Sequence, residues 1–264
     1  MSSRSISCAI REALLTGEAR DKVFAARTVA RDWRLGRLAW TFDCPMPARP
    51  AWPQALELAE PGKMPRRGKG GSEQGRIALW HALAHIEFVA IDLALDMAGR
   101  FGAEGGREFV SDLLSVAADE AMHFALLDRK LNSLGSHYGA LPAHDGLWKS
   151  AQETAHDVTA RLAIVPMVLE ARGLDVTPAT IERTRNQGDA NGARILMRIL
   201  DDEIRHVGIG TRHFRKACAA RDEIPQQLWQ KLVRTYFSGG LKAPFNDSAR
   251  SMAGLSRDFY VGLA

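Results

Sequence analysis

The sequence predicts an all-α fold: a four-helix bundle with helices before it and an irregular tail after it. Apolar residues recur every three or four positions over most of the chain, which is the period of a helix. We find no convincing strand pattern, in which apolar and polar residues would alternate. An acidic pattern also occurs twice at a constant separation, as two successive helical hairpins would give.

Two short helices and an extended segment precede the predicted bundle. Residues 1 to about 40 hold the two helices, which are joined by a turn within "ALLTGEARDK". Residues 41–72 contain more than half of the eleven prolines and several glycines, which do not suit a helix. A basic run from Lys63 to Lys69 lies at the end of this segment.

The first three long helices follow the extended segment. Residues 73–134 are predicted to form a hairpin that reverses within "GRFGAEGGREF", and residues 135–146 form a loop. The third long helix spans 147–173 and ends at Gly173, because glycine is common just after a helix. A short connecting helix opened by Thr177 and Pro178 comes next.

The fourth long helix spans residues 190–220, and a short helix near 225–237 leads into a tail that contains Gly, Pro and Asn. We therefore predict three parts: N-terminal decoration over 1–72, the bundle over 73–222, and a helix with a tail over 223–264 that packs on the bundle.

Composition narrows the class of protein. The 264 residues, 46% of them hydrophobic, can bury a sizeable core. The sequence contains no run of 18 apolar residues, so we expect no membrane span. The N-terminus lacks a clear signal-peptide core and cleavage site, so we expect a cytoplasmic protein. Cys8, Cys44 and Cys218 form no CxxC motif, and we expect neither a disulfide framework nor a rubredoxin-type iron site.

Two five-residue segments carry the same pattern, D-E-x-x-H. They are Asp119–His123 and Asp202–His206, and they lie 83 residues apart. The same offset relates a lone glutamate, Glu87, to Glu170. Each half of the chain thus holds one glutamate, followed 33 residues later by the glutamate of the motif.

These acidic residues fall within apolar helical stripes, and buried carboxylates repel one another unless a cation compensates their charge. One Glu from each of two helices and a Glu-x-x-His from each of the other two is the di-iron carboxylate arrangement. The sequence therefore predicts a dinuclear metal centre. Its six ligands are Glu87, Glu120, His123, Glu170, Glu203 and His206.

Asp119 and Asp202 precede the motif glutamates and have a separate predicted role. Each could accept the second N–H of a ligating histidine on a neighbouring helix and so fix its tautomer. We expect crossed pairs, Asp119 with His206 and Asp202 with His123.

Other candidates have simpler interpretations. A third E-x-x-H, Glu153 to His156, lacks the matching residues 83 positions earlier, so we interpret it as a solvated face. His81 and His85 should not share the metal centre and are assigned to a surrounding layer or to the surface. Pro166 lies one turn before Glu170, where it predicts a kink or a π-bulge.

Five segments between about residue 73 and residue 264 carry a resemblance to known proteins: "HIEFVAIDLALD", "DEAMHFALLDRKL", "LEARGLDVTP", "ILDDEIRHVGIG" and "PFNDSAR". Over this range the chain resembles the ferritin-like superfamily. It is more closely similar to a bacterial family of ferritin-like domain proteins of unknown function. The layout of the metal motifs is also similar to that of the MiaE tRNA-hydroxylase branch.

The resemblance implies two iron ions, with manganese or a mixed Mn/Fe centre as the alternative. Glu87 and Glu170 would be terminal ligands. Glu120 and Glu203 would bridge the metals, and His123 and His206 would each cap one metal.

The implied activity is that of a di-iron oxygenase or oxidase. It would use O2 and an external electron donor to hydroxylate or oxidise a small organic molecule or a modified nucleoside. Tyr138, Tyr236 and Tyr260 lie outside the four predicted core helices, so we expect no stored tyrosyl radical.

Three alternatives stay open. One is a tRNA-modifying hydroxylase that binds RNA through the Lys63–Lys69 run. The second is an iron-storage protein, and the third is a bundle that metal merely stabilises. A homodimer is compatible with each of them.

Overall fold

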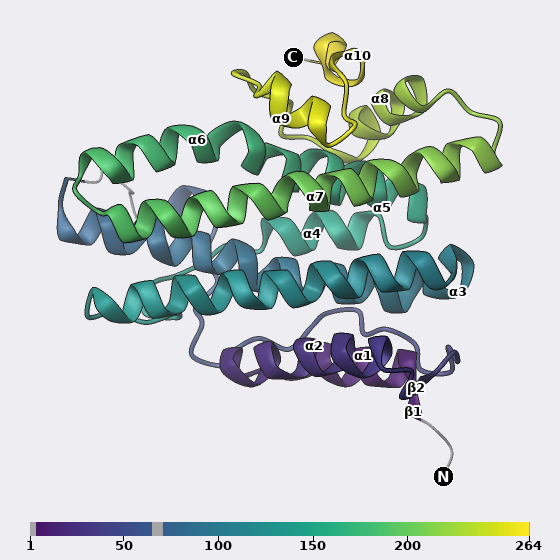
Figure 1. The fold of residues 1–264 in the computed structure, drawn as a ribbon, viewed down its shortest axis with the longest axis horizontal. Helices are drawn as coiled ribbons and strands as arrows, with labels where there is room; N and C mark the ends of the chain where they lie inside the picture. The colour runs from purple at the N-terminus through teal and green to yellow at the C-terminus, as the bar shows by residue number, and fades with distance from the viewer. Residues whose placement is uncertain (1–3, 65–70, 264) are drawn as a thin grey trace. The chain divides into compact units, whose positions relative to one another are not determined.

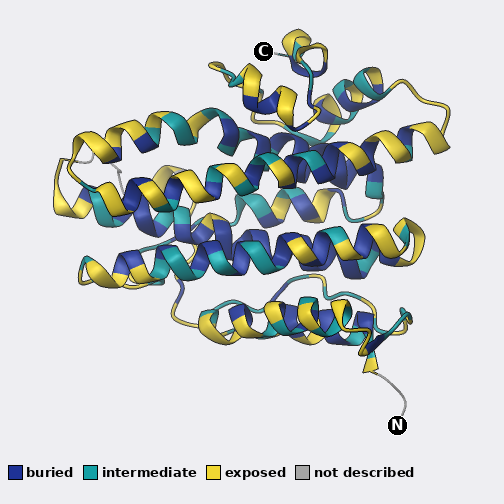
Figure 2. Ribbon diagram, in the orientation of Figure 1, coloured by how far each residue is buried: buried dark blue, intermediate teal, exposed yellow. Residues whose placement is uncertain are grey.

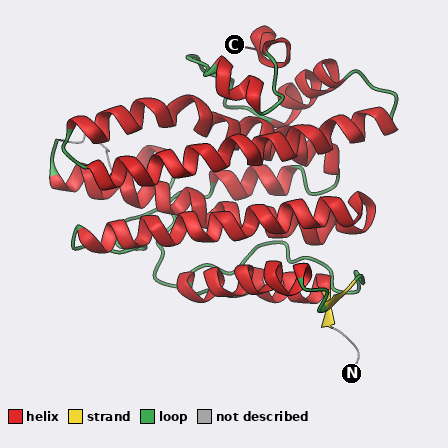
Figure 3. Ribbon diagram, viewed as in Figure 1, coloured by secondary structure: helices red, strands yellow, loops and turns green. Residues whose placement is uncertain are grey.

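Figure 1 shows the computed structural model, which describes residues 4–64 and 71–263. Most of these residues are helical (Figure 3), so the all-α prediction is confirmed. The described residues also contain two short strands, β1 (Arg4–Ser5) and β2 (Leu38–Ala39), which pair in parallel. Two residues are too few to show the alternation of a strand in the sequence.

By its internal contacts the chain divides into an N-terminal unit, up to Trp148, and a C-terminal unit, from Lys149 onward. We describe each unit separately. This division does not test the three predicted parts, which stay a prediction. Residues 65–69, which are most of the basic run, lie outside the described residues.

The N-terminal unit consists of α1 (Ile6–Leu14), α2 (Ala19–Arg34) and α3 (Glu73–Ser133), with a 3-10 turn (Pro61–Lys63) before α3. Both N-terminal helices pack against α3 and against each other. The predicted pair of short helices is therefore confirmed, and so is the extended segment over its described residues 41–64, apart from the 3-10 turn.

The long element α3 is a hairpin rather than one straight helix. It reverses at Gly106, whose φ of 84° belongs to the region that glycine adopts most easily. The side chains of Glu87 and His123, one from each arm, come within hydrogen-bond distance, as antiparallel arms require. The predicted break is confirmed and lies at Gly106.

A buried ion pair links the N-terminal helices to the core of this unit. Lys22 Nζ lies 2.6 Å from Asp92 Oδ1, and both side chains are fully buried. Lys22 also donates to the carbonyls of Leu14 and Ala51, and Trp52 Nε1 donates to Asp92 Oδ2 at 2.8 Å. This network joins α1, α2, α3 and the extended segment.

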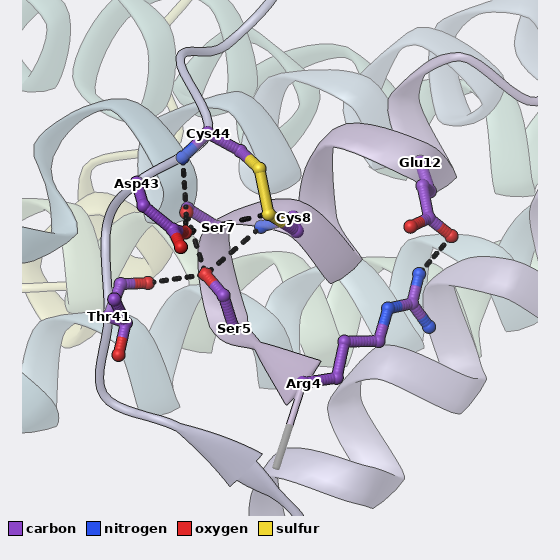
Figure 4. The surroundings of a disulfide bond; sticks show 8 residues. All are labelled: Arg4, Ser5, Ser7, Cys8, Glu12, Thr41, Asp43 and Cys44. Atoms are coloured by element: carbon purple, nitrogen blue, oxygen red, sulfur yellow. Dashed lines mark hydrogen bonds and ion pairs between the residues drawn. A yellow bond between two sulfur atoms is a disulfide. The ribbon is translucent and has the colours of Figure 1, made fainter. Parts of the chain in front are cut away.

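The expectation that no disulfide forms was wrong, because Cys8 and Cys44 are bonded (Figure 4). Their Cα atoms are 5.1 Å apart, within the usual range. Spacing in the sequence did not predict the pair, because long-range contacts bring the two segments together. Ser5 donates to the carbonyl of Thr41, and Ser7 accepts from the N–H of Cys44.

Reducing this disulfide should destabilise the protein. The bond closes a loop between residues 36 positions apart, and closing a loop of that length typically adds about 2–4 kcal/mol to the free energy of unfolding. Urea unfolding with and without reductant measures the loss. Cys44→Ser should abolish the response to reductant, whereas Cys218→Ser should retain it. Three free thiols in the air-oxidised protein would contradict the prediction.

The C-terminal unit is built around two contacting helices, α6 (Ala171–Asn186) and α7 (Ala190–Ala220). Before α6 come α5 (Val158–Ile164) and a π-helical turn, η2 (Val165–Glu170). The predicted distortion at Pro166 is therefore confirmed as a π-helix. The fourth predicted helix coincides with α7.

The predicted third helix was wrong in its limits. α4 (Gly146–Glu153) ends early, and Asp157 caps a new helix by accepting from the N–H of Thr159. Gly173 does not end a helix, and Pro178 lies inside α6 instead of opening a connecting helix. Proline cannot donate to the carbonyl four residues earlier, but the side chain of Asn246 donates to this carbonyl, that of Leu174, at 3.1 Å.

The short helix predicted near 225–237 is confirmed as α8 (Pro225–Tyr236). The predicted irregular tail after it contains α9 (Asp247–Met252), α10 (Arg257–Tyr260) and a 3-10 turn (Val261–Leu263). α8 contacts α5 and α7, and α9 contacts α6 and α7. Arg250 donates two hydrogen bonds to Asp175, at 2.8 and 2.7 Å. Two of the quoted segments, "LEARGLDVTP" and "PFNDSAR", thus contact each other.

Buried residues concentrate on α3 (Figure 2). One window of this helix is apolar and long enough to cross a membrane by composition alone, but 78% of it is buried inside the structure. Core helices of many proteins pass the same test. The absence of a membrane span thus stays a prediction.

Candidate metal centre

Three of the six predicted ligands meet in the N-terminal unit. His123 Nδ1 lies 3.2 Å from Glu87 Oε2 and 3.2 Å from Glu120 Oε2. Glu120 and His123 are fully buried, and Glu87 is 6% exposed. The i, i+3 spacing on one arm of α3 brings Glu120 and His123 together, and the hairpin at Gly106 adds Glu87 from the other arm.

Burial makes this cluster electrostatically unusual. Burial raises the pKa of Glu87 well above its ordinary value, and the neighbouring charge of Glu120 raises it further. Burial alone would lower the pKa of His123, but hydrogen bonds and charges from Glu120 and Glu87 outweigh it and raise the pKa to about 11. The cluster therefore favours a positive charge at its centre.

The other three predicted ligands belong to the C-terminal unit. Glu203 and His206 are buried on α7, with His206 Nδ1 3.7 Å from Glu203 Oε1. Glu170 is half-buried and is the last residue of the π-helical turn. That turn approaches α7 closely: a Cβ at Gly210 would lie 2.3 Å from Pro166 Cβ, so the contact requires glycine.

The two units repeat one local design. Each has a glycine with positive φ, Gly106 or Gly188, between the lone glutamate and the D-E-x-x-H motif. In each motif the histidine presents Nδ1 to the motif glutamate. The repeat seen in the sequence is thus also a repeat of helical hairpins.

The donor set in the N-terminal unit fits a metal ion. Two ligand atoms that are each about 2.1 Å from one ion lie roughly 3.0–3.4 Å apart in tetrahedral or octahedral geometry. The two distances of 3.2 Å at His123 fall in that range. One imidazole and two carboxylates are donors that iron, manganese and zinc accept.

The aspartates Asp119 and Asp202 are both half-buried. Asp202 Oδ2 accepts a hydrogen bond of 2.8 Å from Arg198, one turn earlier on α7. Each predicted crossed pair joins the two units, so the pairs stay predictions.

The third E-x-x-H copy is solvent-facing, as predicted. Glu153 and His156 are both exposed, and α4 ends at Glu153. His156 Nε2 instead lies 3.0 Å from the hydroxyl of Tyr236.

A buried histidine–tyrosine cluster was missed by the sequence analysis. Of the two positions expected for His81 and His85, a surrounding layer or the surface, burial of both side chains excludes the surface. His85 Nε2 lies 3.0 Å from the carbonyl of His144, which can only accept, so Nε2 carries the hydrogen. His85 Nδ1 then accepts from the hydroxyl of Tyr138 at 2.9 Å. Tyr138 lies in a loop, yet its ring packs on Phe88 and Phe124 of α3. The sequence offered no periodic signal for this contact.

Acidification should destabilise the protein through His81. Burial, and to a lesser extent the charge of His137, lower the pKa of His81 from 6.5 to about 4. Between these values the unfolded chain binds a proton that the folded chain does not, so stability falls as the pH drops from 6.5 to 4. The loss should be at most about 1.4 kcal/mol per pH unit. Urea unfolding across this range should show a shallower decline for His81→Gln than for the exposed control His156→Gln; equal slopes would contradict the prediction.

Comparison with known proteins places the chain in a family. Residues 15–261 match the model of a family described as "Protein of unknown function (DUF455)". The chain belongs to this family. An "Uncharacterized protein" of Haemophilus influenzae is 41% identical over 213 residues, which cover 78% of this chain and 74% of the relative. No solved structure gives a significant match. The family match covers both units, including all six predicted ligands.

Proposed function

We propose that this DUF455 protein is a di-iron oxygenase or oxidase with a ferritin-like four-helix bundle. In this proposal the arms of α3 and the α6–α7 hairpin with its π-helical turn form the bundle. Glu87, Glu120 and His123 then face Glu170, Glu203 and His206 across its core. The observation that supports it best is the buried cluster of His123 and two carboxylates, whose charges and spacing suit a metal ion.

The repeated hairpins support two metal ions rather than one. Each hairpin offers one lone glutamate and one Glu-x-x-His, which is half of a dinuclear carboxylate site. When bound, two iron ions would activate O2. The chain's own residues would hold the ions, compensate their charge and keep water away, because the surrounding positions of α3 are apolar and buried.

O2 consumption by the reduced, iron-loaded protein tests this function. With an electron donor and a panel of nucleosides and small organic molecules, we expect substrate-dependent uptake over many turnovers. Glu120→Ala should reduce the rate by at least about a hundredfold, because losing a metal-supporting residue typically costs 10–100-fold and a ligand costs more. The exposed control Glu153→Ala should leave it unchanged. A single turnover, followed by accumulation of ferric iron in the protein, would instead indicate iron storage.

A further inference from the structure

A groove in the N-terminal unit runs between α2 and the second arm of α3. Its volume is about 960 Å³. The polar residues important here are four arginines, one serine and one aspartate. They are Arg27, Arg31, Arg34, Arg107, Ser115 and Asp119.

The charge of this groove is strongly positive. Four guanidinium groups line it, against the single lining carboxylate of Asp119. One of the four, Arg31, is already paired with the neighbouring Asp32, at 3.2 Å. Arg27, Arg31 and Arg34 repeat at helical spacing on the exposed face of α2, whose opposite face is buried. Among the residues that the structure describes, no carboxylate lies within ion-pair distance of Arg27 or Arg34. These guanidinium groups are available to a ligand.

One of the four arginines is held in place by aromatic rings. The guanidinium carbon of Arg107 lies 5.5 Å from the ring centre of Trp33 and 5.1 Å from that of Trp40. Trp33 Nε1 in turn donates to Ser111 Oγ at 2.9 Å, and Ser111 donates to the carbonyl of Arg107 at 2.8 Å. A guanidinium fixed in this way loses little conformational entropy when it binds an anion.

The groove also reaches the residue that precedes a predicted metal ligand in the sequence. Arg107 and Asp119 lie on the same arm of α3, about 18 Å apart at 1.5 Å per residue. Asp119 directly precedes Glu120, which is in the buried cluster. A ligand that fills the groove would therefore reach Asp119, which precedes Glu120 in the sequence; the side chain of Glu120 itself is fully buried and does not line the groove.

We propose that this groove binds the phosphate group of the substrate, so that the substrate is a phosphate-bearing organic molecule. Guanidinium groups match phosphate oxygens in charge and geometry. The assignment as substrate rests on the proposed function, whereas the binding itself does not. The phosphate could belong to a free nucleotide or to an RNA strand, and both are included in the test.

Binding of pyrophosphate, AMP and a short single-stranded RNA to the full chain at low salt tests the proposal. Calorimetry suits the small anions, and fluorescence anisotropy suits a labelled RNA. Arg27→Gln with Arg34→Gln should weaken binding of the favoured probe at least about tenfold. The matched control Arg11→Gln with Arg129→Gln removes two exposed positive charges outside the groove and should have less than a twofold effect.

Groove-dependent binding of pyrophosphate or AMP would support the proposal with a small phosphorylated substrate. Groove-dependent binding of RNA alone would support it with an RNA substrate. Failure of all three probes to bind, or equal weakening by the two double variants, would overturn it. Each assay is run on chelator-treated and iron-loaded protein, with metal content measured in parallel. A protein that binds phosphate but retains no metal refutes only the proposed function, and the reverse result refutes only the groove.

Discussion

The protein should retain about two iron ions per chain after anaerobic loading, and Glu120→Ala or Glu203→Ala should reduce this to less than one. The expectation follows from burial: Glu120 is fully buried beside Glu87, and two carboxylates at this depth are costly without a cation. Mass spectrometry of metals after gel filtration gives the count. Manganese is measured in the same samples, because a carboxylate-rich site accepts either metal.

The chain provides a matched control for this experiment. Glu153→Ala removes the glutamate of the third E-x-x-H copy, which is exposed, and should leave the metal content unchanged. Metal binding should also stabilise the fold by about 2.7 kcal/mol at a hundredfold excess over the dissociation constant, so a chelator should lower the melting temperature. A well-folded wild type that retains no metal would make the six residues a structural polar cluster.

The residues of the candidate site could be predicted because helical periodicity and a repeated motif both point to them. Spacing alone placed Glu120 beside His123, and the predicted reversal near Gly106 allowed Glu87 to reach them. The predictions that failed depended on contacts between distant residues. Pro178 stays inside a helix because Asn246 satisfies the carbonyl of Leu174, and no local pattern reveals such a partner.

The same limit applies to the N-terminal unit. The disulfide, the loop tyrosine Tyr138 against α3 and the arginine groove all join segments that have no shared period or motif. Lys22 is an instructive case, because a lysine in a charged stretch suggests an exposed position. Its burial depends on Asp92, which is 70 residues away.

Replacing Lys22 by methionine should therefore lower the free energy of unfolding by about 3–5 kcal/mol. Methionine retains the bulk of the lysine stem but leaves the Asp92 carboxylate buried without its cation. Burial already raises the pKa of Asp92 to about 6 despite the lysine, so removing the positive charge should raise it further. The variant should then be least impaired at acidic pH, where Asp92 is protonated and Trp52 can still donate to it.

The double variant Lys22→Met with Asp92→Leu separates loss of the pair from loss of one partner. Removing both charges eliminates the unpaired carboxylate, so we expect the double variant to recover at least about half of the stability lost by the single one. Urea unfolding at pH 5 and pH 8 measures both effects. A single variant as stable as wild type at pH 8 would mean that the buried pair contributes nothing. Equal losses in the single and double variants would instead mean that the lysine acts through its bonds to the carbonyls of Leu14 and Ala51.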